Sequence, residues 1–315
     1  MFDPERFVKE ETEKLRQKLD GKALIACSGG VDSGVAAVIA KNAIGKDLIA
    51  VHVDTGFMRK GESGNVRKSL EKAGLGLKFI NAKDDFFRVL KGATEPEKKR
   101  KIIGEMFIRI FERIAKEEGI RYLIQGTIAP DWIESGGGER DTIKSHHNVG
   151  GLPEDIGLEI VEPLRDIYKD EVRKVARFLG VDAMEKQPFP GPGLAVRVVG
   201  EVDEEKVDIV REANAIMEEE IEKASLDEKI TKPWQYFATL LPAKTVGVHG
   251  DVRNYGYVIA LRSVESIDGM SAAYSKIPHE ILDRISIRIT NTLGKKVNRV
   301  VYDITNKPPG TIEFE

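Results

Sequence analysis

The sequence predicts an α/β protein, built as a parallel sheet wrapped by helices and followed by a second, smaller α+β domain. In the first half, short apolar runs alternate with amphipathic stretches, a pattern typical of a parallel sheet with helical crossovers. In the second half, the expected element order is β-α-β-β-α-β, as in split-βαβ domains. A Pro- and Gly-rich run at 188–193 separates the halves and excludes a helix or central strand. We therefore place the two domains at 1–188 and 189–315.

The elements of the first half follow from hydrophobic periodicity. Strands are expected at 22–26, 48–53, 77–80 and 122–124, and helices at 35–44, 63–73, 97–118 and 168–179. Ligands of such a sheet bind at the carboxyl ends of its strands. The stretch 126–157 has weak periodicity and many glycines, which is typical of a functional lid.

The second half begins with an expected strand at 194–199. Helices are expected at 203–224, with Asp203 as N-cap, and at 278–293, with Pro278 in its first turn. Further strands are expected at 234–241, 257–262 and 298–304.

Composition excludes several classes of protein. The net charge is −3, with 49 basic and 52 acidic residues, which argues against a protein that grips long nucleic acid by neutralising phosphates. Cys27 is the single cysteine, so an intrachain disulfide, a thiolate zinc cage and a Cys-X-X-Cys pair are excluded. Neither a signal peptide nor a membrane-length apolar run is present. We expect a cytoplasmic protein without membrane association.

The run Ser28–Ser33 (SGGVDS) lies between the first expected strand and helix. Gly29 and Gly30 would let the backbone N–H groups approach an anion at the helix N-terminus, and the serines add hydroxyl donors. Asp32 would repel a bare phosphate, so it is expected to hold Mg²⁺ that bridges the phosphates. The alternative is a Gly-rich turn with an Asp/Ser cap. The Gly-Lys-Ser/Thr ending of a Walker loop is missing.

Other candidate residues leave more than one interpretation open. Asp54, at the end of the second strand, could bind a ribose hydroxyl, help to hold Mg²⁺, or cap a turn. Arg59 could meet a substrate phosphate or be a solvated charge. Lys144 on the expected lid could reach charge developing on phosphates, or be a surface lysine. His146 and His147 are adjacent and would point apart, so a metal site there is not favoured.

The Ser28–Ser33 run resembles the pyrophosphate loop of the N-type ATP pyrophosphatases, which have the adenine nucleotide alpha hydrolase-like fold. It departs at Gly34, where many members carry a second serine or threonine. Longer strings resemble the GMP synthetase branch of that family, and together they cover nearly the whole chain: 125–135, 143–153, 188–197, 246–253 and 297–315.

The resemblance implies that ATP–Mg²⁺ adenylates XMP at its C2 oxygen and that ammonia then displaces AMP to give GMP. It implies catalytic roles for Lys144 and Asp32, with Asp32 also as the Mg²⁺ ligand. The implied ATP and pyrophosphate contacts are Ser28, Gly29, Gly30, Val31, Asp32, Ser33, Gly34, Asp54 and Gly126. The implied XMP contacts are Arg59, Arg197, His249, Arg253, Lys307 and Glu313.

The resemblance also implies a homodimer formed by the second domain, and ammonia from a separate glutamine amidotransferase subunit. Cys27 lies at the end of the first expected strand and not at a nucleophile elbow, so the chain itself is not expected to hydrolyse glutamine. Other members of the family, such as NAD synthetase, argininosuccinate synthetase or a tRNA thiolase, are alternatives; a single cysteine and no basic excess argue against a thiolase. A regulatory nucleotide-binding protein without turnover is a further alternative, against which intact Asp32, Ser33 and Lys144 argue.

Overall fold

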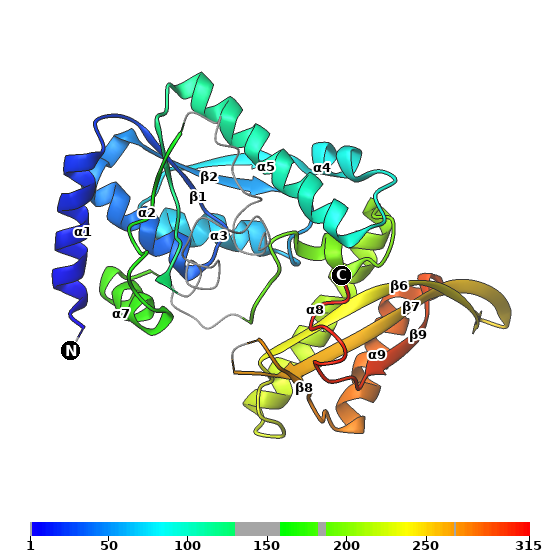
Figure 1. The fold of residues 1–315 in the computed structure, drawn as a ribbon. Helices are drawn as coiled ribbons and strands as arrows, with labels where there is room; N and C mark the ends of the chain where they lie inside the picture. Colours follow the sequence, from blue (N-terminus) through cyan, green and yellow to red (C-terminus); the bar gives the residue numbers. More distant parts are fainter. Residues whose placement is uncertain (1, 130–157, 182–186, 268) are drawn as a thin grey trace. The chain divides into compact units, whose positions relative to one another are not determined.

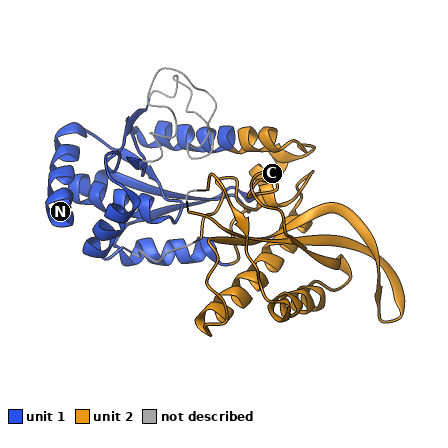
Figure 2. Cartoon of the chain, turned by 60° about the horizontal axis from the view of Figure 1, so that its bottom comes forward, with its two compact units in different colours: residues 1–56, 61–83, 104–185 blue, residues 57–60, 84–103, 186–315 orange. Residues whose placement is uncertain are grey.

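The structure is a computed structural model that describes residues 2–129, 158–181, 187–267 and 269–315. The chain forms two compact units. Unit 1 contains residues 1–56, 61–83 and 104–185, and unit 2 contains residues 57–60, 84–103 and 186–315 (Figure 2). Two short segments of the first half therefore belong to the same unit as the C-terminal half. A division of the chain into 1–188 and 189–315 stays a prediction.

Unit 1 is built on a five-stranded parallel sheet, which confirms the predicted α/β fold class. Its strands are β1 Ala23–Ala26, β2 Leu48–Asp54, β3 Leu77–Asn81, β4 Tyr122–Ile124 and β5 Glu159–Val161, in the order β3-β2-β1-β4-β5. The chain adds β2 and β3 on one side of β1, and β4 and β5 on the other. The point where this direction reverses lies between β1 and β4, and that point is where open α/β sheets bind their ligands.

Helices cover both faces of this sheet. The helices of the first half are α1 Pro4–Lys18, α2 Val31–Ile44, α3 Glu62–Lys72, α4 Lys83–Leu90, α5 Pro96–Glu118 and α7 Lys169–Leu179, with the short 3-10 turn η1 Gly45–Asp47. Nearly all of α4 and the first part of α5 belong to unit 2, and the rest belong to unit 1. Ala23 and Ile25 of β1 share one apolar core with residues of α1, α2, α3 and α7. Leu24 is also fully buried and points to the other face, because side chains alternate along a strand. Figure 1 shows α5 on the side of the sheet opposite α2 and α7.

Unit 2 contains a second sheet with two helices. Its strands are β6 Gln235–His249, β7 Val252–Glu265, β8 Ala273–Tyr274 and β9 Val297–Asp303, and its helices are α8 Glu204–Leu226 and α9 His279–Leu293. Strands β6 and β8 run antiparallel to β7, and β9 runs parallel to it. The Asp203 carboxylate accepts the Lys206 N–H at 2.8 Å, so the predicted N-cap of α8 is confirmed. Short 3-10 turns lie at η3 Gly193–Arg197 and η4 Gly294–Lys296.

The strand predicted at 194–199 is wrong. Residues 193–197 form the 3-10 turn η3, and Gly193 enters it with φ +64°. The Gly193 N–H donates to the Pro190 carbonyl at 2.8 Å, so a turn occupies the place where a strand would begin. Only Val198 keeps a bridge of β type, to Leu240.

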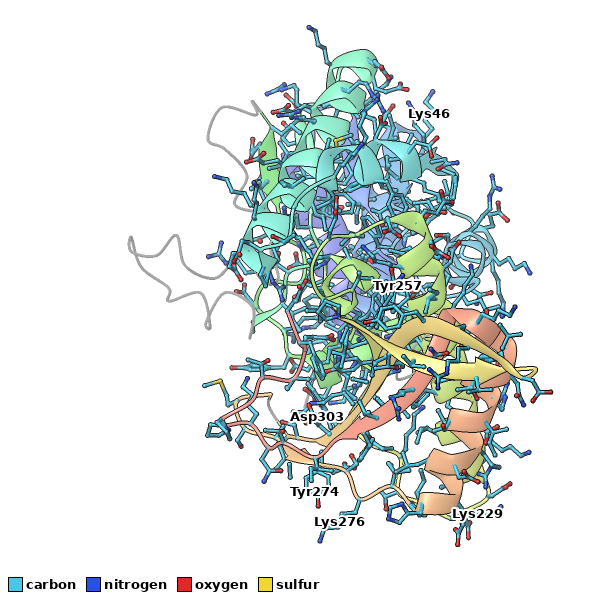
Figure 3. The ribbon with its side chains drawn as sticks, turned by 90° about the vertical axis from the view of Figure 1, so that its right-hand side faces the viewer. Lys46, Lys229, Tyr257, Tyr274, Lys276 and Asp303 are labelled. Atoms are coloured by element: carbon cyan, nitrogen blue, oxygen red, sulfur yellow. The ribbon has the colours of Figure 1, made fainter. Side chains whose placement is uncertain are left out.

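The C-terminal segment, residues 304–315, follows β9 within unit 2 and is tied to β7 by Arg262. Asp303, labelled in Figure 3, lies at the end of β9, and its carboxylate is 3.1 Å from the guanidinium of the buried Arg262. The same guanidinium donates to the Thr311 carbonyl at 2.9 Å and to the Ile312 carbonyl at 3.4 Å. One buried cation thus fixes both the start of this segment and the stretch that leads to Glu313.

No helix among the residues described is long and apolar enough to cross a membrane.

Candidate functional site

The turn after β1 has the geometry of an anion cradle. Gly29 has φ +87°, and a Cβ there would lie 2.3 Å from Val66 Cγ2, so glycine is required for two separate reasons. Gly30 is the N-cap of α2, so the first N–H groups of the helix are directed toward the end of the sheet. The Ser33 hydroxyl donates to the Gly30 carbonyl at 3.0 Å, and the Ser28 and Ser33 oxygens are 3.3 Å apart. The serines thus brace the loop from both ends.

Asp32, in the first turn of α2, meets Lys169. Its Oδ2 lies 2.6 Å from Nζ of Lys169, the first residue of α7. Its Oδ1 is buried and has no hydrogen-bond partner among the described residues. A buried carboxylate oxygen without a donor is costly, which indicates that a cation or a donor belongs at this position during function. Lys169 was not selected from the sequence.

Gly126 lies two residues after β4, against the start of α2. A Cβ at Gly126 would be 2.9 Å from both the Asp32 carbonyl carbon and the Ser33 nitrogen. Because these are backbone atoms, no side-chain movement relieves the contact. The structure therefore brings Gly126 together with the Ser28–Ser33 loop at the point where the strand order reverses. Gly34 lies in the same helix, where a Cβ would be 3.1 Å from Val181 Cγ1.

Asp54 ends β2 and caps the turn that follows. Its Oδ1 accepts the Gly56 N–H at 2.9 Å, which is the turn-capping alternative of the sequence analysis; ribose or metal binding stays a prediction. Two residues earlier in β2, the buried His52 has Nδ1 at 2.7 Å from the Cys27 carbonyl. Burial raises the pKa of the Cys27 thiol to about 12, so this thiol stays protonated and is no nucleophile.

In unit 2, Arg197 and Glu313 form a two-pronged ion pair. Arg197 Nε and Nη2 donate to the two carboxylate oxygens of Glu313 at 3.1 and 2.8 Å, and Nη1 donates to Asn214 at 3.1 Å. Gln235 Nε2 donates to Glu313 Oε1 at 2.8 Å. The Arg197 side chain is 0% exposed, and that of Glu313 is 14% exposed. Of the two, Glu313 is the one with surface for a ligand; contact of Arg197 with XMP stays a prediction.

Arg59 lies beside the same cluster. Its guanidinium is 4.4 Å from the ring centre of Phe189, and that of Arg197 is 5.1 Å from the same ring. Arg59 also pairs with Glu218, with Nε to Oε1 at 3.2 Å. Burial raises the pKa of Glu218, and the charge of Arg59 opposes that rise. Two arginines thus lie against one aromatic ring, and each of them is paired with a glutamate. The sequence offered no signal for Glu218, because it lies within a long helix rich in glutamate.

The remaining expected XMP contacts are Lys307, His249 and Arg253, which also belong to unit 2. Lys307 Nζ donates to the Gly269 carbonyl at 2.7 Å. His249 and Arg253 lie at the tip of the β6–β7 hairpin, where His249 pairs with Val252. Gln235, which contacts Glu313, and His249 stand at opposite ends of β6, about 45 Å apart along a strand of that length. One chain therefore does not bring His249 and Arg253 to the Arg197–Glu313 pair.

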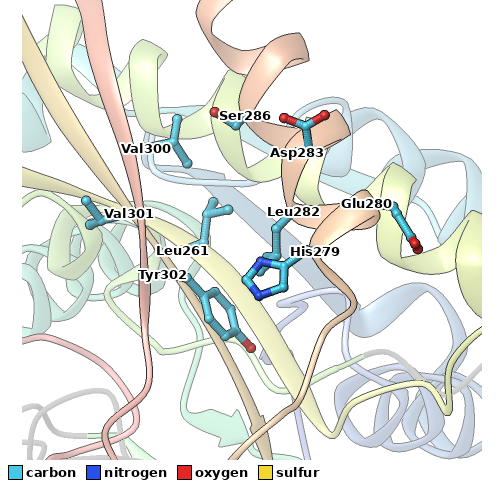
Figure 4. A pocket seen from close by; sticks show the side chains of 9 residues that line it. All are labelled: Leu261, His279, Glu280, Leu282, Asp283, Ser286, Val300, Val301 and Tyr302. Atoms are coloured by element: carbon cyan, nitrogen blue, oxygen red, sulfur yellow. The ribbon is translucent and has the colours of Figure 1, made fainter.

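A cavity of about 550 Å³ lies between α9 and β9 in unit 2 (Figure 4). Its lining among the described residues includes His279, Glu280 and Asp283 together with apolar residues, and contains no lysine or arginine. Such a lining does not suit a phosphorylated ligand. The expected phosphate contacts lie outside it.

Several expectations fall on residues outside the described part of the chain. Lys144, His146, His147 and nearly all of the lid expected at 126–157 lie within 130–157. Among the described residues, no group of three or more His, Cys, Asp or Glu side chains could hold a metal ion. A single carboxylate still suits Mg²⁺, which is commonly held by one or two carboxylates together with substrate phosphates.

Two family models match the chain. The model for the GMP synthase C terminal domain matches residues 219–314, and the model for the thiamine biosynthesis protein ThiI matches residues 18–189. Among solved structures, the NMN synthetase from Francisella tularensis superposes with a TM-score of 0.50 at 16% identity, covering 66% of this chain and 85% of that one. This likeness concerns the fold alone.

Curated relatives resemble the chain over its full length. It is 60% identical over 319 residues to a subunit of the glutamine-hydrolyzing GMP synthase of Methanopyrus kandleri, with 100% of both chains covered. It is 59% identical to the protein of the same name from Pyrococcus horikoshii, with 98% of this chain and 99% of that one covered. The corresponding Methanocaldococcus jannaschii protein is 56% identical, again with 100% of both chains covered.

Proposed function

Because the chain belongs to the family of these glutamine-hydrolyzing GMP synthase subunits, we propose that it is the synthetase subunit that converts XMP into GMP with ATP and ammonia. The C2 oxygen of XMP attacks the α-phosphorus of ATP, and the bond to the bridging oxygen breaks to release pyrophosphate. Ammonia then attacks C2 and loses a proton, and AMP leaves with the former C2 oxygen. The observation that carries the proposal is the Ser28–Ser33 cradle, in which Asp32 has one carboxylate oxygen paired with Lys169 and the other without a hydrogen-bond partner among the described residues.

In this reaction the cradle holds the leaving pyrophosphate. Backbone N–H groups at the start of α2 and the hydroxyls of Ser28 and Ser33 would donate to its oxygens. Val31 and Gly34 lie in the first turn of α2 and would contribute only backbone groups to pyrophosphate binding. Since adenylyl transfer depends mainly on position and electrostatics, a rigid cradle lowers the barrier without reacting itself. Asp54 would lie at the ribose.

Asp32 is the residue we propose to hold Mg²⁺. Its Oδ1 is buried without a partner in the described structure, which fits a metal ligand. When bound, Mg²⁺ would neutralise part of the triphosphate charge. Lys169, which meets Oδ2 of Asp32 at 2.6 Å, would keep the carboxylate in place and can itself approach a phosphate. Lys144 is proposed to act on the same phosphates, and closure of the lid would exclude water from the adenylated intermediate.

We propose that XMP binds in unit 2 at the cluster around Phe189. Glu313 would accept N–H groups of the xanthine ring, and Arg59 and Lys307 would meet its anionic groups. In the described structure Arg59 faces the carboxylate of Glu218 at 3.2 Å. An incoming phosphate would compete with that carboxylate for the guanidinium. Arg197 would bind XMP or hold Glu313 in position for it.

A homodimer is part of the proposal. The β6–β7 hairpin exposes Val246, Val248, Val252 and Tyr255, and exposed apolar groups of this kind mark interaction sites. Because His249 and Arg253 are far along the hairpin from Glu313, they would serve XMP bound to a second copy. The relatives are each named as one subunit of a glutamine-hydrolyzing enzyme, so ammonia would come from a separate glutaminase subunit. As a biosynthetic enzyme the complex would work in the cytoplasm, without nucleic acid or membrane.

The test uses the purified chain with ATP, Mg²⁺ and an ammonium salt, so that no glutaminase is needed. XMP, deamido-NAD and no acceptor are compared, and pyrophosphate and GMP are measured. We expect pyrophosphate and GMP to form when XMP is the acceptor, and neither product to form with deamido-NAD or without an acceptor. Release with deamido-NAD and not with XMP would keep the loop chemistry and refute the substrate. Absence of release with every acceptor, in the presence of the glutaminase subunit as well, would favour a regulatory role.

A further inference from the structure

Lys99 is a buried lysine that none of the roles above uses. It lies in the first part of α5, within unit 2, and its side chain is 0% exposed. Its ammonium donates to the Val198 carbonyl at 2.7 Å, to the Ala195 carbonyl at 3.4 Å, and to the carboxylate of Glu315. A lysine enclosed in this way is costly unless every N–H is satisfied. The three acceptors around Lys99 satisfy this requirement, and the question is what role such a buried lysine has.

Glu315 is equally enclosed, with a side chain that is 4% exposed. Its Oε1 accepts the Gly200 N–H at 2.8 Å, and its backbone oxygen accepts from Arg100 at 2.6 Å. The last residue of the C-terminal segment is thus anchored by two neighbouring side chains of α5 and by the backbone just after η3. We call the set Lys99, Arg100, Gly200 and Glu315 the tail clamp.

The tail clamp joins the two backbone segments that carry the Arg197–Glu313 pair. Ala195 and Val198, whose carbonyls Lys99 binds, flank Arg197 in the sequence. Glu315 is two residues beyond Glu313. One ammonium group therefore contacts both segments, each within two residues of a partner in the bidentate Arg197–Glu313 pair, whose distances are 2.8 and 3.1 Å.

We propose that Lys99 is a positioning residue for XMP: it holds Glu313 in place through Glu315, and Arg197 in place through the carbonyls on either side of it. This inference rests on the proposed function, because it assumes that Glu313 binds XMP. Burial lowers the pKa of Lys99, and the carboxylate of Glu315 opposes that change. Lys99 thus depends on Glu315 to stay charged where it is buried. The competing interpretation is an ion pair that stabilises unit 2 and has no influence on the ligand.

The first test compares Lys99→Met with Lys98→Met, a change at the adjacent exposed lysine of the same helix. We expect Lys99→Met to raise the KM for XMP on the order of tenfold to a hundredfold, as the loss of a supporting partner or a misplacement near 1 Å does. The KM for ATP should stay at the wild-type value, because the ATP loop lies in unit 1. Lys98→Met should match wild type for both substrates. An equal rise in both KM values, or none, would overturn the proposal.

The double variant Lys99→Met/Glu315→Met separates positioning from stability. Replacing a buried ion pair by apolar groups commonly restores stability, so its thermal midpoint should lie above that of Lys99→Met. The carbonyls of Ala195 and Val198 would still lack their donor, so the KM for XMP should stay raised. If the double variant recovers both the thermal midpoint and the wild-type KM for XMP, the Lys99–Glu315 ion pair only stabilises unit 2 and the proposal is wrong.

Hydrogen exchange gives a readout that needs no XMP. The Gly200 amide and the peptide covering 307–315 should exchange more slowly in wild type and Lys98→Met than in Lys99→Met. If Lys99→Met folds poorly, Glu315→Gln tests the same clamp, since it keeps the shape and removes the charge. Unchanged exchange in these variants would overturn the clamp. If the wild-type chain makes no GMP, the proposed function fails by itself, while the exchange result still decides whether the clamp exists.

Discussion

Gly126→Ala tests whether the nucleotide site lies where the strand order of unit 1 reverses. The added Cβ would lie 2.9 Å from two backbone atoms, the carbonyl carbon of Asp32 and the nitrogen of Ser33. Because neither atom can rotate away, the first turn of α2 must move relative to β4. Overpacking of this kind costs about 1–3 kcal/mol. When this free energy is added to the ATP-bound state and not to the free state, ATP affinity falls by about 5- to 150-fold.

The assay is calorimetric titration with ATP–Mg²⁺, combined with thermal unfolding of each variant. Gly21→Ala is the matched control, because Gly21 has no positive φ and a Cβ there has nothing within 4 Å. We expect Gly21→Ala to bind ATP as wild type does. Wild-type affinity in a folded Gly126→Ala chain would refute the placement of the site, as would an equal loss in Gly21→Ala.

Three further changes test other parts of the structure. Asp32→Asn should lower pyrophosphate release at least about a hundredfold with the thermal midpoint kept; full activity would exclude Asp32 as the metal ligand. Because burial raises the pKa of Cys27 from 9.0 to about 12, its contribution to stability is complete below pH 9.0 and is lost as the pH rises toward 12. Urea unfolding across this range should therefore show a steeper loss in wild type than in Cys27→Ala, and equal slopes would contradict the assigned burial. Arg262→Met leaves Asp303 without its buried partner and should cost about 3–5 kcal/mol of unfolding free energy, whereas Arg299→Met at an exposed position of β9 should cost little.

The sequence was sufficient for the elements whose patterns are local. The predicted strand at 122–124 has the observed bounds, and the strand predicted at 48–53 is extended by one residue. The loop Ser28–Ser33 also has a local signature, since glycines and hydroxyls must occur together after a strand. The structure places it after β1 as predicted, but Val31, Asp32 and Ser33 already belong to the first turn of α2, which was predicted to begin at 35.

Failures occurred where tertiary contacts override local pattern. Residues 194–198 are all apolar apart from Arg197 and read as a buried strand, yet Gly193 sets them into a 3-10 turn. Leu194 then donates its N–H to the Phe57 carbonyl at 2.8 Å, from a segment distant in sequence. Such a contact has no signature within a window of a few residues.

Side-chain partners were beyond sequence reasoning for the same reason. Lys169 meets Asp32 across 137 positions, and Lys99 meets Glu315 across 216. Strand β5 was not predicted, so the sequence offered no reason to place the start of α7 beside the Ser28–Ser33 loop. From the sequence, Lys169 was therefore expected only to lie near the start of a helix, with no functional partner.

The central claim is that XMP itself is adenylated, and transfer of an oxygen label tests it most directly. XMP carrying ¹⁸O at C2 is incubated with the chain, ATP–Mg²⁺ and an ammonium salt, and the products are analysed by mass spectrometry. Since the C2 oxygen attacks the α-phosphorus and later leaves with AMP, the label should appear in the phosphate of AMP. Label in water or in pyrophosphate, with unlabelled AMP, would contradict adenylation of XMP.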